Sequence, residues 1–290
     1  MATKATKGGN YGEESIRVLK GLEPVKQRPG MYTRTENPLH VVQEVIDNAA
    51  DEALAGAGTR IDVALHADGS VTVDDDGRGI PMGLHPEEKV SVVEIVFTRL
   101  HAGGKFDKGG NAAYSFSGGL HGVGVSVTNA LAKRLEVTVW RGGQAATIAF
   151  AGGAVVEPLA TRKAAASERK SGTRVRVWPD PRYFESAELP RAELTHVLRS
   201  KAVLMPGVKV SLTIEKPNRG EPERTDWLYS GGLSDYLLQT LAADPAIPLF
   251  EGAHHAAPSP SATSSLSRPS AWCAPSKSGI AGSAASVCSR

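Results

Sequence analysis

The chain has 290 residues, of which 41% are apolar and 22% charged, and its formal net charge is +2. Such a chain can bury one large core or two smaller ones, and its near-neutral charge gives no general attraction to nucleic acid or membranes. It contains no run of eighteen apolar residues, and its polar start, MATKATKGGN, lacks the apolar segment of a secretion signal. The two cysteines, Cys273 and Cys288, provide neither a metal cluster nor a disulfide framework for the main body. We therefore expect a cytoplasmic protein with no membrane partner.

The first part of the chain predicts two helices, a hairpin and a third helix, in that order. Residues 11–20 and 39–55 are helical in pattern, and in the second range apolar residues recur at helical spacing along one stripe. Residues 61–73 predict a β-hairpin, because apolar residues alternate on both sides of the turn ADGS. Residues 85–100 predict a helix that begins with a proline and two glutamates, at 86–88, which suit a helix N-terminus.

The remainder of the main body mixes helices and strands. Residues 100–124 form a long segment rich in glycine and polar residues, which is typical of a functional lid or a disordered loop. Helices are expected over 124–133 and 191–203. Four stretches have the alternation of strands: LEVTVWRGG, AATIAFAGG, GTRVRVWPD and VKVSLTI. Because helices and hairpins do not strictly alternate, we expect an α+β fold, with helices on one face of a mixed, mostly antiparallel sheet.

The last forty residues, 251–290, differ sharply from the rest of the chain. They contain eleven serines, nine alanines, no aspartate and one glutamate, and the apolar periodicity stops. A segment of this composition does not bury enough apolar surface to fold alone. We interpret it as a low-complexity tail that is not native to the domain, such as a frameshift in the coding sequence would produce. Residues 1–10 are interpreted as a disordered tail.

The helix expected over 39–55 carries polar residues opposite its apolar stripe. Glu44, Asn48 and Glu52 are spaced four residues apart, so they share one face of the helix. A neutral amide oxygen suits a hard cation such as Mg²⁺, and a carboxylate one turn away can orient or deprotonate a water molecule. The alternative is a solvated acidic face on an ordinary surface helix.

The run DDDGRGIP at 74–81 follows the second strand of the hairpin. Gly77 and Gly79 allow the backbone to approach a ligand closely. A buried carboxylate in this run can accept a hydrogen bond from an exocyclic amine. The alternative is a sharp acidic turn, which the dipeptide Asp-Gly favours by itself.

The stretch SFSGGLHGVGVSVTNAL at 115–131 places four glycines within residues 118–124, directly before an expected helix. Main-chain N–H groups in such a loop point toward an anion, and the helix dipole assists them. The spacing is not that of a P-loop, because no Gly-Lys-Ser/Thr follows, and no short strand leads into it as in the dinucleotide fingerprint. Lys105 can add a positive charge for phosphate. His121 can act as ligand or base, although a histidine in a glycine loop commonly packs locally.

In chain order, the motifs EVIDNAADEA, DDDGRGIP, GGLHGVG and SGT (171–173) resemble those of the GHKL ATPases. This group includes topoisomerase ATPase subunits, heat-shock chaperones, histidine kinases and MutL-type repair proteins. Within it, GLEPVKQRPGMY, HAGGKF and GGLHGVGVSVTNAL are similar to the B subunits of bacterial type II topoisomerases. RPGMYT and LTHVLRSKAVLMPGV are more similar to topoisomerase IV B subunits than to gyrase B. The resemblance covers residues 11–250, and its length disfavours a chaperone or repair protein.

This resemblance implies a Bergerat-type two-layer α/β sandwich that binds ATP and Mg²⁺. By motif position, Glu44 is expected to be the general base that activates water against the γ-phosphate. Asn48 is the expected Mg²⁺ ligand. Asp75 is the expected acceptor for the adenine amine, with Thr173 beside it through water.

Other positions complete the implied nucleotide site. Arg78 is expected to pair with Glu52 beside the adenine pocket, and Gly79 to border the same pocket. Arg141 and Pro81 are expected at its outer edge, which the family's aminocoumarin inhibitors reach. The residues expected around the phosphates are Lys105 at the lid and Gly119, Leu120, His121, Gly122, Val123, Gly124 and Val125 in the loop.

The resemblance also implies an assembly. Residues 11–25, which include Ile16, are expected to form an arm that swaps onto a second protomer. Tyr11 is then expected to touch the nucleotide of that partner, so that ATP binding closes a homodimer. A topoisomerase A-type subunit and DNA are the partners implied for the full-length protein.

The implied function of residues 11–250 is ATP binding and hydrolysis in a topoisomerase IV B subunit, which decatenates and relaxes DNA. The family continues into a transducer domain, whose lysine reaches the γ-phosphate, and then into a metal-binding cleavage module. Neither pattern is found in this chain, so we expect weak or absent hydrolysis. The alternatives are a fragment of gyrase B and a nucleotide-binding fragment that is catalytically inactive.

Overall fold

The computed structural model describes residues 18–102, 122–216 and 220–241. Contacts divide the chain into two units, residues 1–236 and 237–290. Of the second unit, the structure describes only residues 237–241, which are the end of one helix and the residue after it. The tails expected at 1–10 and 251–290 therefore lie outside the described residues.

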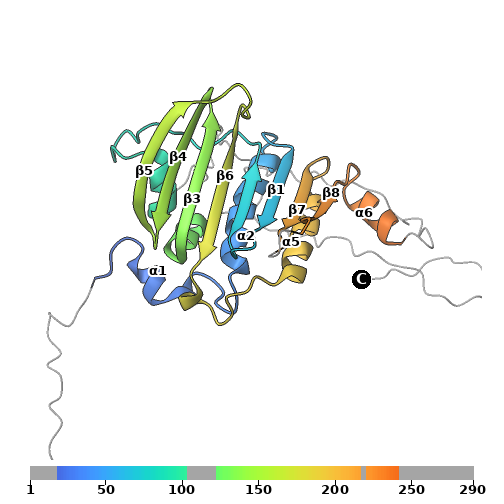
Figure 1. The fold of residues 1–290 in the computed structure, drawn as a ribbon, viewed down its shortest axis with the longest axis horizontal. Coiled ribbons are helices and arrows are strands. Elements are labelled where there is room, and N and C mark those ends of the chain that lie inside the picture. The colour runs from blue at the N-terminus through green and yellow to red at the C-terminus, as the bar shows by residue number, and fades with distance from the viewer. Residues whose placement is uncertain (1–17, 103–121, 217–219, 242–290) are drawn as a thin grey trace, which may run out of the picture. The chain divides into compact units, whose positions relative to one another are not determined.

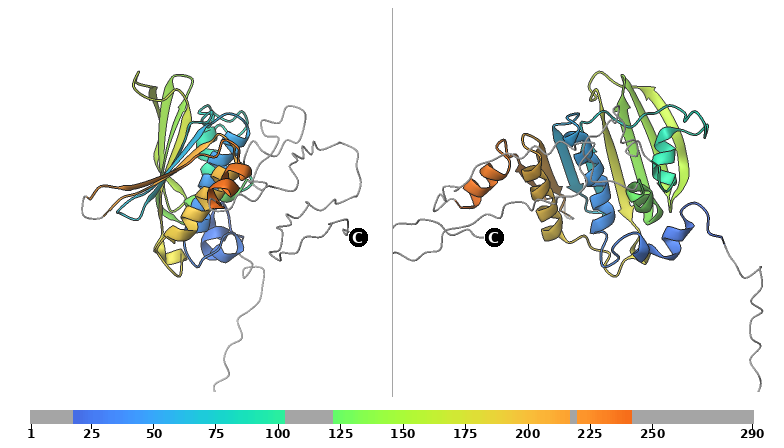
Figure 2. Two further views of the ribbon diagram at one scale, coloured as in Figure 1. Left: turned by 90° about the vertical axis from the view of Figure 1, so that its right-hand side faces the viewer. Right: turned by 180° about the vertical axis from the view of Figure 1, so that it is seen from behind.

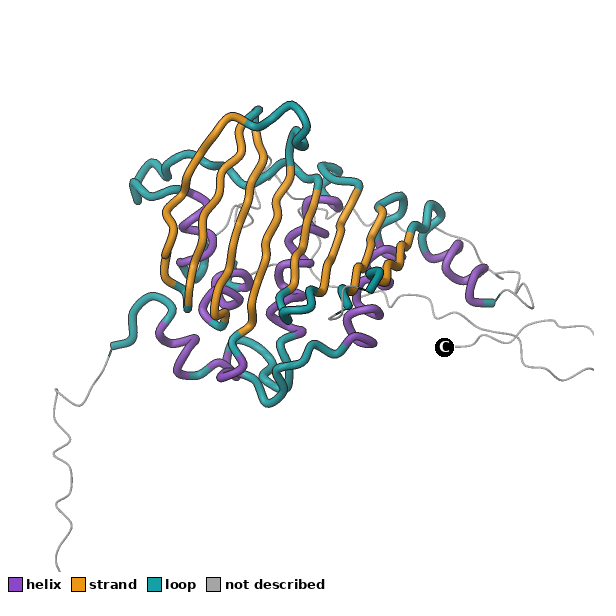
Figure 3. The backbone as a smooth tube through the Cα atoms, viewed as in Figure 1, coloured by secondary structure: helices purple, strands orange, loops and turns teal. Residues whose placement is uncertain are grey.

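The first unit is built on one eight-stranded sheet, seen face-on in Figure 1 and Figure 3. Its strand order is β5-β4-β3-β6-β2-β1-β7-β8. Neighbouring strands are antiparallel in every pair except β1 and β7, which run parallel. The strands are β1 (Arg60–Leu65), β2 (Val71–Asp75), β3 (Ala132–Arg141), β4 (Gln144–Ala151), β5 (Ala154–Lys163), β6 (Gly172–Pro179), β7 (Lys209–Ile214) and β8 (Glu223–Trp227).

Helices α1 to α5 lie on one face of this sheet, which Figure 2 shows edge-on. Within the described residues the other face carries no helix, and we call it the open face. This arrangement confirms the expected fold class, in which helices cover one face of a mixed, mostly antiparallel sheet. The helices are α1 (Glu23–Gln27), η2 (Pro29–Met31), α2 (Leu39–Leu54), α3 (Val92–Thr98), α4 (Gly124–Ala130), η3 (Pro181–Tyr183), α5 (Arg191–Leu204) and α6 (Leu233–Thr240).

The main core lies between the sheet and the helix layer. Alternate residues of each central strand, such as Ile61 and Val63 on β1, point toward the helices and are almost fully buried. The apolar stripe predicted for the second helix, including Val42 and Ile46, is buried in the same cluster. Burial of each such side chain contributes roughly 1.5–3 kcal/mol relative to exposure, so α2 is held firmly against β1 and β2. The polar face of α2 is consequently directed away from the strands.

Two predicted helices have different limits in the structure. The helix expected over 85–100 begins at Val92, because the Ser91 hydroxyl accepts a hydrogen bond from the Glu94 N–H at 3.1 Å and caps it. Lys89 has a left-handed φ of 56°, which interrupts any helix from 86–88. The prediction of that start was therefore wrong. The helix expected over 124–133 ends earlier, because β3 begins to pair with β6 at Ala132.

Several elements were not predicted, namely α1, α6, β5 and β8. β5 and β8 are the edge strands of the sheet and are mostly exposed, so neither shows the apolar alternation of a half-buried strand. Of the helix predicted over 11–20, only residues 18–20 are described, and these are not helical. No helix in the described ranges is both long and apolar enough to cross a membrane.

Candidate functional site

The middle of α2 faces the beginning of α4. Glu44 and Asn48 lie one turn apart on α2 and are both partly exposed, whereas the apolar stripe around them is buried. A methyl group added at Gly124, the first residue of α4, would lie 2.7 Å from the Glu44 carboxyl carbon and would overlap its carboxylate. The last part of the glycine loop therefore lies directly against Glu44, and a side chain at position 124 would displace that carboxylate from its present position.

Sequence reasoning did not identify His40, which lies one turn before Glu44. Its Nε2 is 3.9 Å from Glu44 Oε1, and its Nδ1 is 2.7 Å from the Thr33 hydroxyl oxygen. Burial, together with the charge of Arg34, lowers the pKa of His40 below its usual value, so the ring is neutral at pH 7. The spacing of four residues on one helix is the signal that places this imidazole beside Glu44.

Asp75 ends β2 and is buried beneath the same helix layer. Its Oδ1 accepts hydrogen bonds from the N–H of Gly77 at 2.9 Å and from the N–H of Thr173 at 3.3 Å. Thr173 is its direct partner across the β2–β6 ladder. The β2–β6 register thus brings together two predicted site residues that are far apart in the chain.

The environment of Asp75 strongly favours its protonated form. Burial raises the pKa of Asp75 to about 7, and the negative charges of Glu52 and Asp74 act in the same direction. The hydrogen bonds from Gly77 and Thr173 oppose this shift but do not cancel it. A carboxyl group with such a pKa can exchange its proton near neutral pH, which is typical of a functional site.

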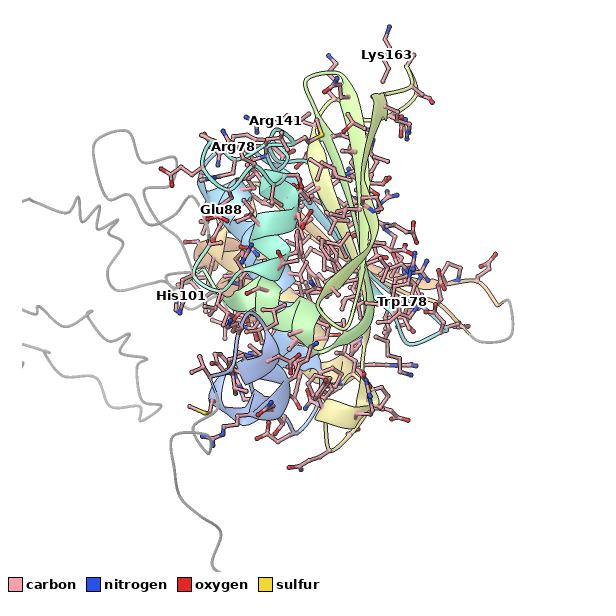
Figure 4. The ribbon with its side chains drawn as sticks, turned by 90° about the vertical axis from the view of Figure 1, so that its left-hand side faces the viewer. Arg78, Glu88, His101, Arg141, Lys163 and Trp178 are labelled. Atoms are coloured by element: carbon pink, nitrogen blue, oxygen red, sulfur yellow. The ribbon has the colours of Figure 1, made fainter. Side chains whose placement is uncertain are left out.

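The arginine predicted beside this carboxylate pairs with α2. Arg78 donates to Glu52 through its side chain, from Nη2 at 2.8 Å and from Nε at 3.0 Å, and through its main-chain N–H at 3.0 Å. Arg141, at the end of β3, donates from Nη1 to the Gly79 carbonyl at 2.7 Å. Both arginines lie on the helix side of the sheet at one end, whereas Trp178 lies on the open face (Figure 4). Pro81 is exposed near them.

The other predicted site residues fall in two groups. Gly122 to Val125 form the described end of the glycine loop and lead into α4, next to Glu44. The predicted residues that lie outside the described ranges are Tyr11, Lys105, Gly119, Leu120 and His121.

Residues 34–183 match the family described as "Histidine kinase-, DNA gyrase B-, and HSP90-like ATPase". The chain belongs to this ATPase family. The matched range contains α2, the run at 74–81, the end of the glycine loop and Thr173, which are the parts that converge in the structure.

Within this family, the chain is similar in sequence to B subunits of DNA topoisomerase 4 and of DNA gyrase. The chain is 51% identical over 238 residues to the B subunit of DNA topoisomerase 4 from Escherichia coli, covering 82% of this chain and 36% of that protein. It is 49% identical over 241 residues to the corresponding protein of Pseudomonas aeruginosa, covering 82% and 37%. Its identity to the B subunit of DNA gyrase from Thermotoga maritima is 49% over 230 residues, covering 78% and 35%. The chain therefore spans a little over a third of the length of these relatives.

Two solved structures share the fold. The topoisomerase IV ATP-binding domain of Francisella tularensis, in complex with a small-molecule inhibitor, superposes with a TM-score of 0.65 at 39% identity, over 81% of this chain and 62% of that one. The 43K ATPase domain of Thermus thermophilus gyrase B, in complex with an aminocoumarin, gives a TM-score of 0.66 at 38% identity, over 83% and 61%. The chain is thus an ATPase domain of the topoisomerase IV and gyrase B kind.

Proposed function

We propose that this domain binds ATP with Mg²⁺ and hydrolyses it within a topoisomerase IV B subunit that decatenates and relaxes DNA. The contact between Gly124 and Glu44 is the observation that supports this most directly. It brings a loop of main-chain N–H groups against a carboxylate that can act on water, while Asp75 provides a separate acceptor for a base.

Each part of a nucleotide then meets a suitable group. The adenine amine donates to Asp75, next to Thr173, and the N–H groups of Gly122 to Val125 hold phosphate oxygens. Glu44 orients the attacking water and accepts its proton, with the neutral ring of His40 beside it at 3.9 Å. Phosphoryl transfer needs positioned phosphates and an oriented water more than covalent chemistry, and these groups supply the part of that positioning which lies within this domain.

The donor set also fits a magnesium ion. Asn48 places an amide oxygen on the helix face that carries Glu44, and Mg²⁺ prefers few protein oxygens together with phosphates and waters. When bound, the ion would neutralise negative charge on the phosphates. Asn48 would therefore be the protein ligand of the ion, and Glu44 would remain available to orient water.

The assembly is part of the same proposal. Residues 11–25 form the arm that carries Tyr11 to a second protomer, and residues 11–250 form the ATPase domain, with the remaining 251–290 as a separate tail. The topoisomerase A-type subunit and DNA are the partners of the whole protein. The similarity to the B subunit of DNA topoisomerase 4 from Escherichia coli supports these partners.

Titration of Mg-ATP into the purified chain, followed by calorimetry and by phosphate release, tests the function. Asn48→Ala is expected to weaken binding about tenfold in Mg²⁺ and to change little in excess chelator, because only the metal-dependent part is lost. Glu44→Gln is expected to retain binding and to slow any phosphate release by about 100-fold or more. Unchanged metal dependence in the first variant, or unchanged release in the second, would contradict the corresponding role.

The pKa of Asp75 makes ATP binding pH-dependent. Because the ionised carboxylate is the stronger acceptor and burial raises the pKa of Asp75 to about 7, affinity is expected to fall as the pH drops below 7, by up to about tenfold per pH unit. Carbon-13 NMR of the side-chain carboxyl should give a midpoint near pH 7 without nucleotide and a lower midpoint with Mg-ATP. A midpoint near 4 in the free protein would refute this explanation.

A further inference from the structure

A loop on the open face reaches the strand end that carries Asp75. Residues 164–171 connect β5 to β6, and from this loop Arg169 forms two hydrogen bonds to the carboxylate of Asp74, one of them from Nη2 at 2.7 Å. Arg169 Nη1 also donates to the main-chain carbonyl of Asp75 at 2.9 Å. Since successive residues of a strand point to opposite faces, Asp74 lies on the open face while Asp75 points toward the helices.

This arginine is held in a single position. Its side chain is only 19% exposed, that of Asp74 is 7% exposed, and its guanidinium stacks over the Trp140 ring at 4.4 Å from the centroid. The neighbouring Glu168 fastens the same loop, accepting hydrogen bonds from the Trp140 indole N–H at 3.2 Å and from Arg162. A planar guanidinium in such a setting can fix the direction of a carbonyl group.

The Asp75 carbonyl is confined from a second side as well. Gly172, at the start of β6, has a φ of 132°, and a methyl group there would overlap that carbonyl oxygen. The peptide group that follows Asp75 is therefore clamped between Arg169 and Gly172, whereas the Asp75 side chain is held by Gly77 and Thr173 on the helix side. The orientation of the carboxylate thus depends on contacts from both faces of the sheet.

We propose that Arg169 is a positioning residue for nucleotide binding, which sets the geometry of Asp75 from the open face without touching the ligand. The inference rests on the proposed function, because Asp75 is taken as the acceptor for the base. It assigns a role in ligand binding to a loop on the face of the sheet opposite the nucleotide.

The charged groups around Asp75 allow the effect of Arg169 to be measured in the titration of the Asp75 carboxyl. Glu52 and Asp74 disfavour its ionised form, Arg78 neutralises Glu52, and the positive charge of Arg169 interacts with both Asp74 and Asp75. Removing Arg169 therefore shifts the Asp75 titration to higher pH, and removing the charge of Asp74 shifts it to lower pH. A loop with no electrostatic link to Asp75 predicts neither shift.

The experiment compares Arg169→Gln, Asp74→Asn and the control Arg174→Gln in the full chain. Arg174 is the matched control because it also donates to Asp74, at 2.6 Å, but has no hydrogen bond to Asp75 in the described structure. We expect Arg169→Gln to weaken binding of a nonhydrolysable ATP analogue about tenfold at pH 8 and Arg174→Gln to weaken it less than twofold. The carboxyl NMR midpoint of Asp75 should rise in Arg169→Gln and fall in Asp74→Asn.

These results test whether Arg169 positions Asp75 for nucleotide binding or only stabilises its own loop. Unchanged affinity and midpoint in a folded Arg169→Gln protein would overturn the inference, as would an Asp74→Asn midpoint that stays the same or rises. If Arg169→Gln does not fold, Arg169→Lys takes its place, because lysine keeps the charge but loses the paired guanidinium contacts; it should still weaken binding, and wild-type affinity in that variant would overturn the inference. If the wild type failed to bind the analogue while both midpoints moved as expected, the proposed function would fail and the electrostatic link would stand.

Discussion

Replacing Asp75 with asparagine is expected to reduce ATP affinity by about 100-fold or more at pH 8 while making the protein more stable. Oδ1 already accepts two main-chain hydrogen bonds, so an asparagine would keep its oxygen there. Its N–H₂ group would then take the position of Oδ2 and face the adenine amine, donor against donor. A site built around one hydrogen bond discriminates strongly against such a mismatch. Calorimetric titration of Mg-ATP measures the loss.

The gain in stability comes from removing a buried carboxyl group that must ionise at high pH. Because burial raises the pKa of Asp75 above its value in the unfolded chain, the contribution of Asp75 to wild-type stability falls as the pH rises from about 4 through 7. A neutral asparagine avoids this loss, so its unfolding temperature should exceed that of wild type at pH 8 by about 2–4 °C, the shift produced by about 1 kcal/mol in a domain of this size. The difference should shrink as the pH falls and disappear near pH 4.

Asp76→Asn is the matched control. Asp76 accepts hydrogen bonds from the main-chain N–H groups of Thr59 at 2.8 Å and Arg60 at 2.9 Å. Although burial opposes the shift, these hydrogen bonds hold the pKa of its carboxyl below the usual value. Asp76→Asn should therefore lower stability and leave ATP affinity within about threefold. If Asp75→Asn bound ATP as tightly as Asp76→Asn, Asp75 could not be the acceptor for the base.

The second large effect is expected for Gly79→Ala, which should lower the free energy of unfolding by about 3 kcal/mol or more. Gly79 has a φ of 74°, and an alanine costs roughly 1–2 kcal/mol in that region. Its methyl group would also overlap the Trp140 carbonyl oxygen and approach the Gly172 carbonyl to 3.2 Å. These are backbone atoms of paired strands that cannot rotate away, so the clash adds a strain of similar size.

Thermal unfolding measures this loss directly. A decrease of about 6–12 °C corresponds to about 3 kcal/mol in a domain of this size. Gly83→Ala provides the control, because no heavy atom lies within 4 Å of the added methyl group and the φ is not left-handed. It should change stability by less than about 0.5 kcal/mol. Equal unfolding temperatures for the two variants would show that the β3–β6 end of the site tolerates a side chain at Gly79.

Local patterns in the sequence were enough to predict much of the fold. The apolar stripe of α2 and the alternation in β1 and β2 arise from side-chain periodicity, which any amphipathic element retains in isolation. Helix α3 was placed too early, because a proline and two glutamates suit an N-terminus as well as Ser91 does. The exposed strands β5 and β8 carry no such periodicity, since pairing at a sheet edge needs no buried face.

The sequence by itself determined the chemical types at the site: a carboxylate and an amide on one helix, an acid before two glycines, and a glycine loop before a second helix. Only the tertiary structure decided three contacts. Gly124 lies against Glu44, the N–H of Thr173 donates to Asp75, and Arg169 donates to the Asp75 carbonyl from the open face. These contacts depend on strand register and on packing between residues up to 98 positions apart. The raised pKa of Asp75 has the same origin, because burial and neighbouring charges exist only once the chain has folded.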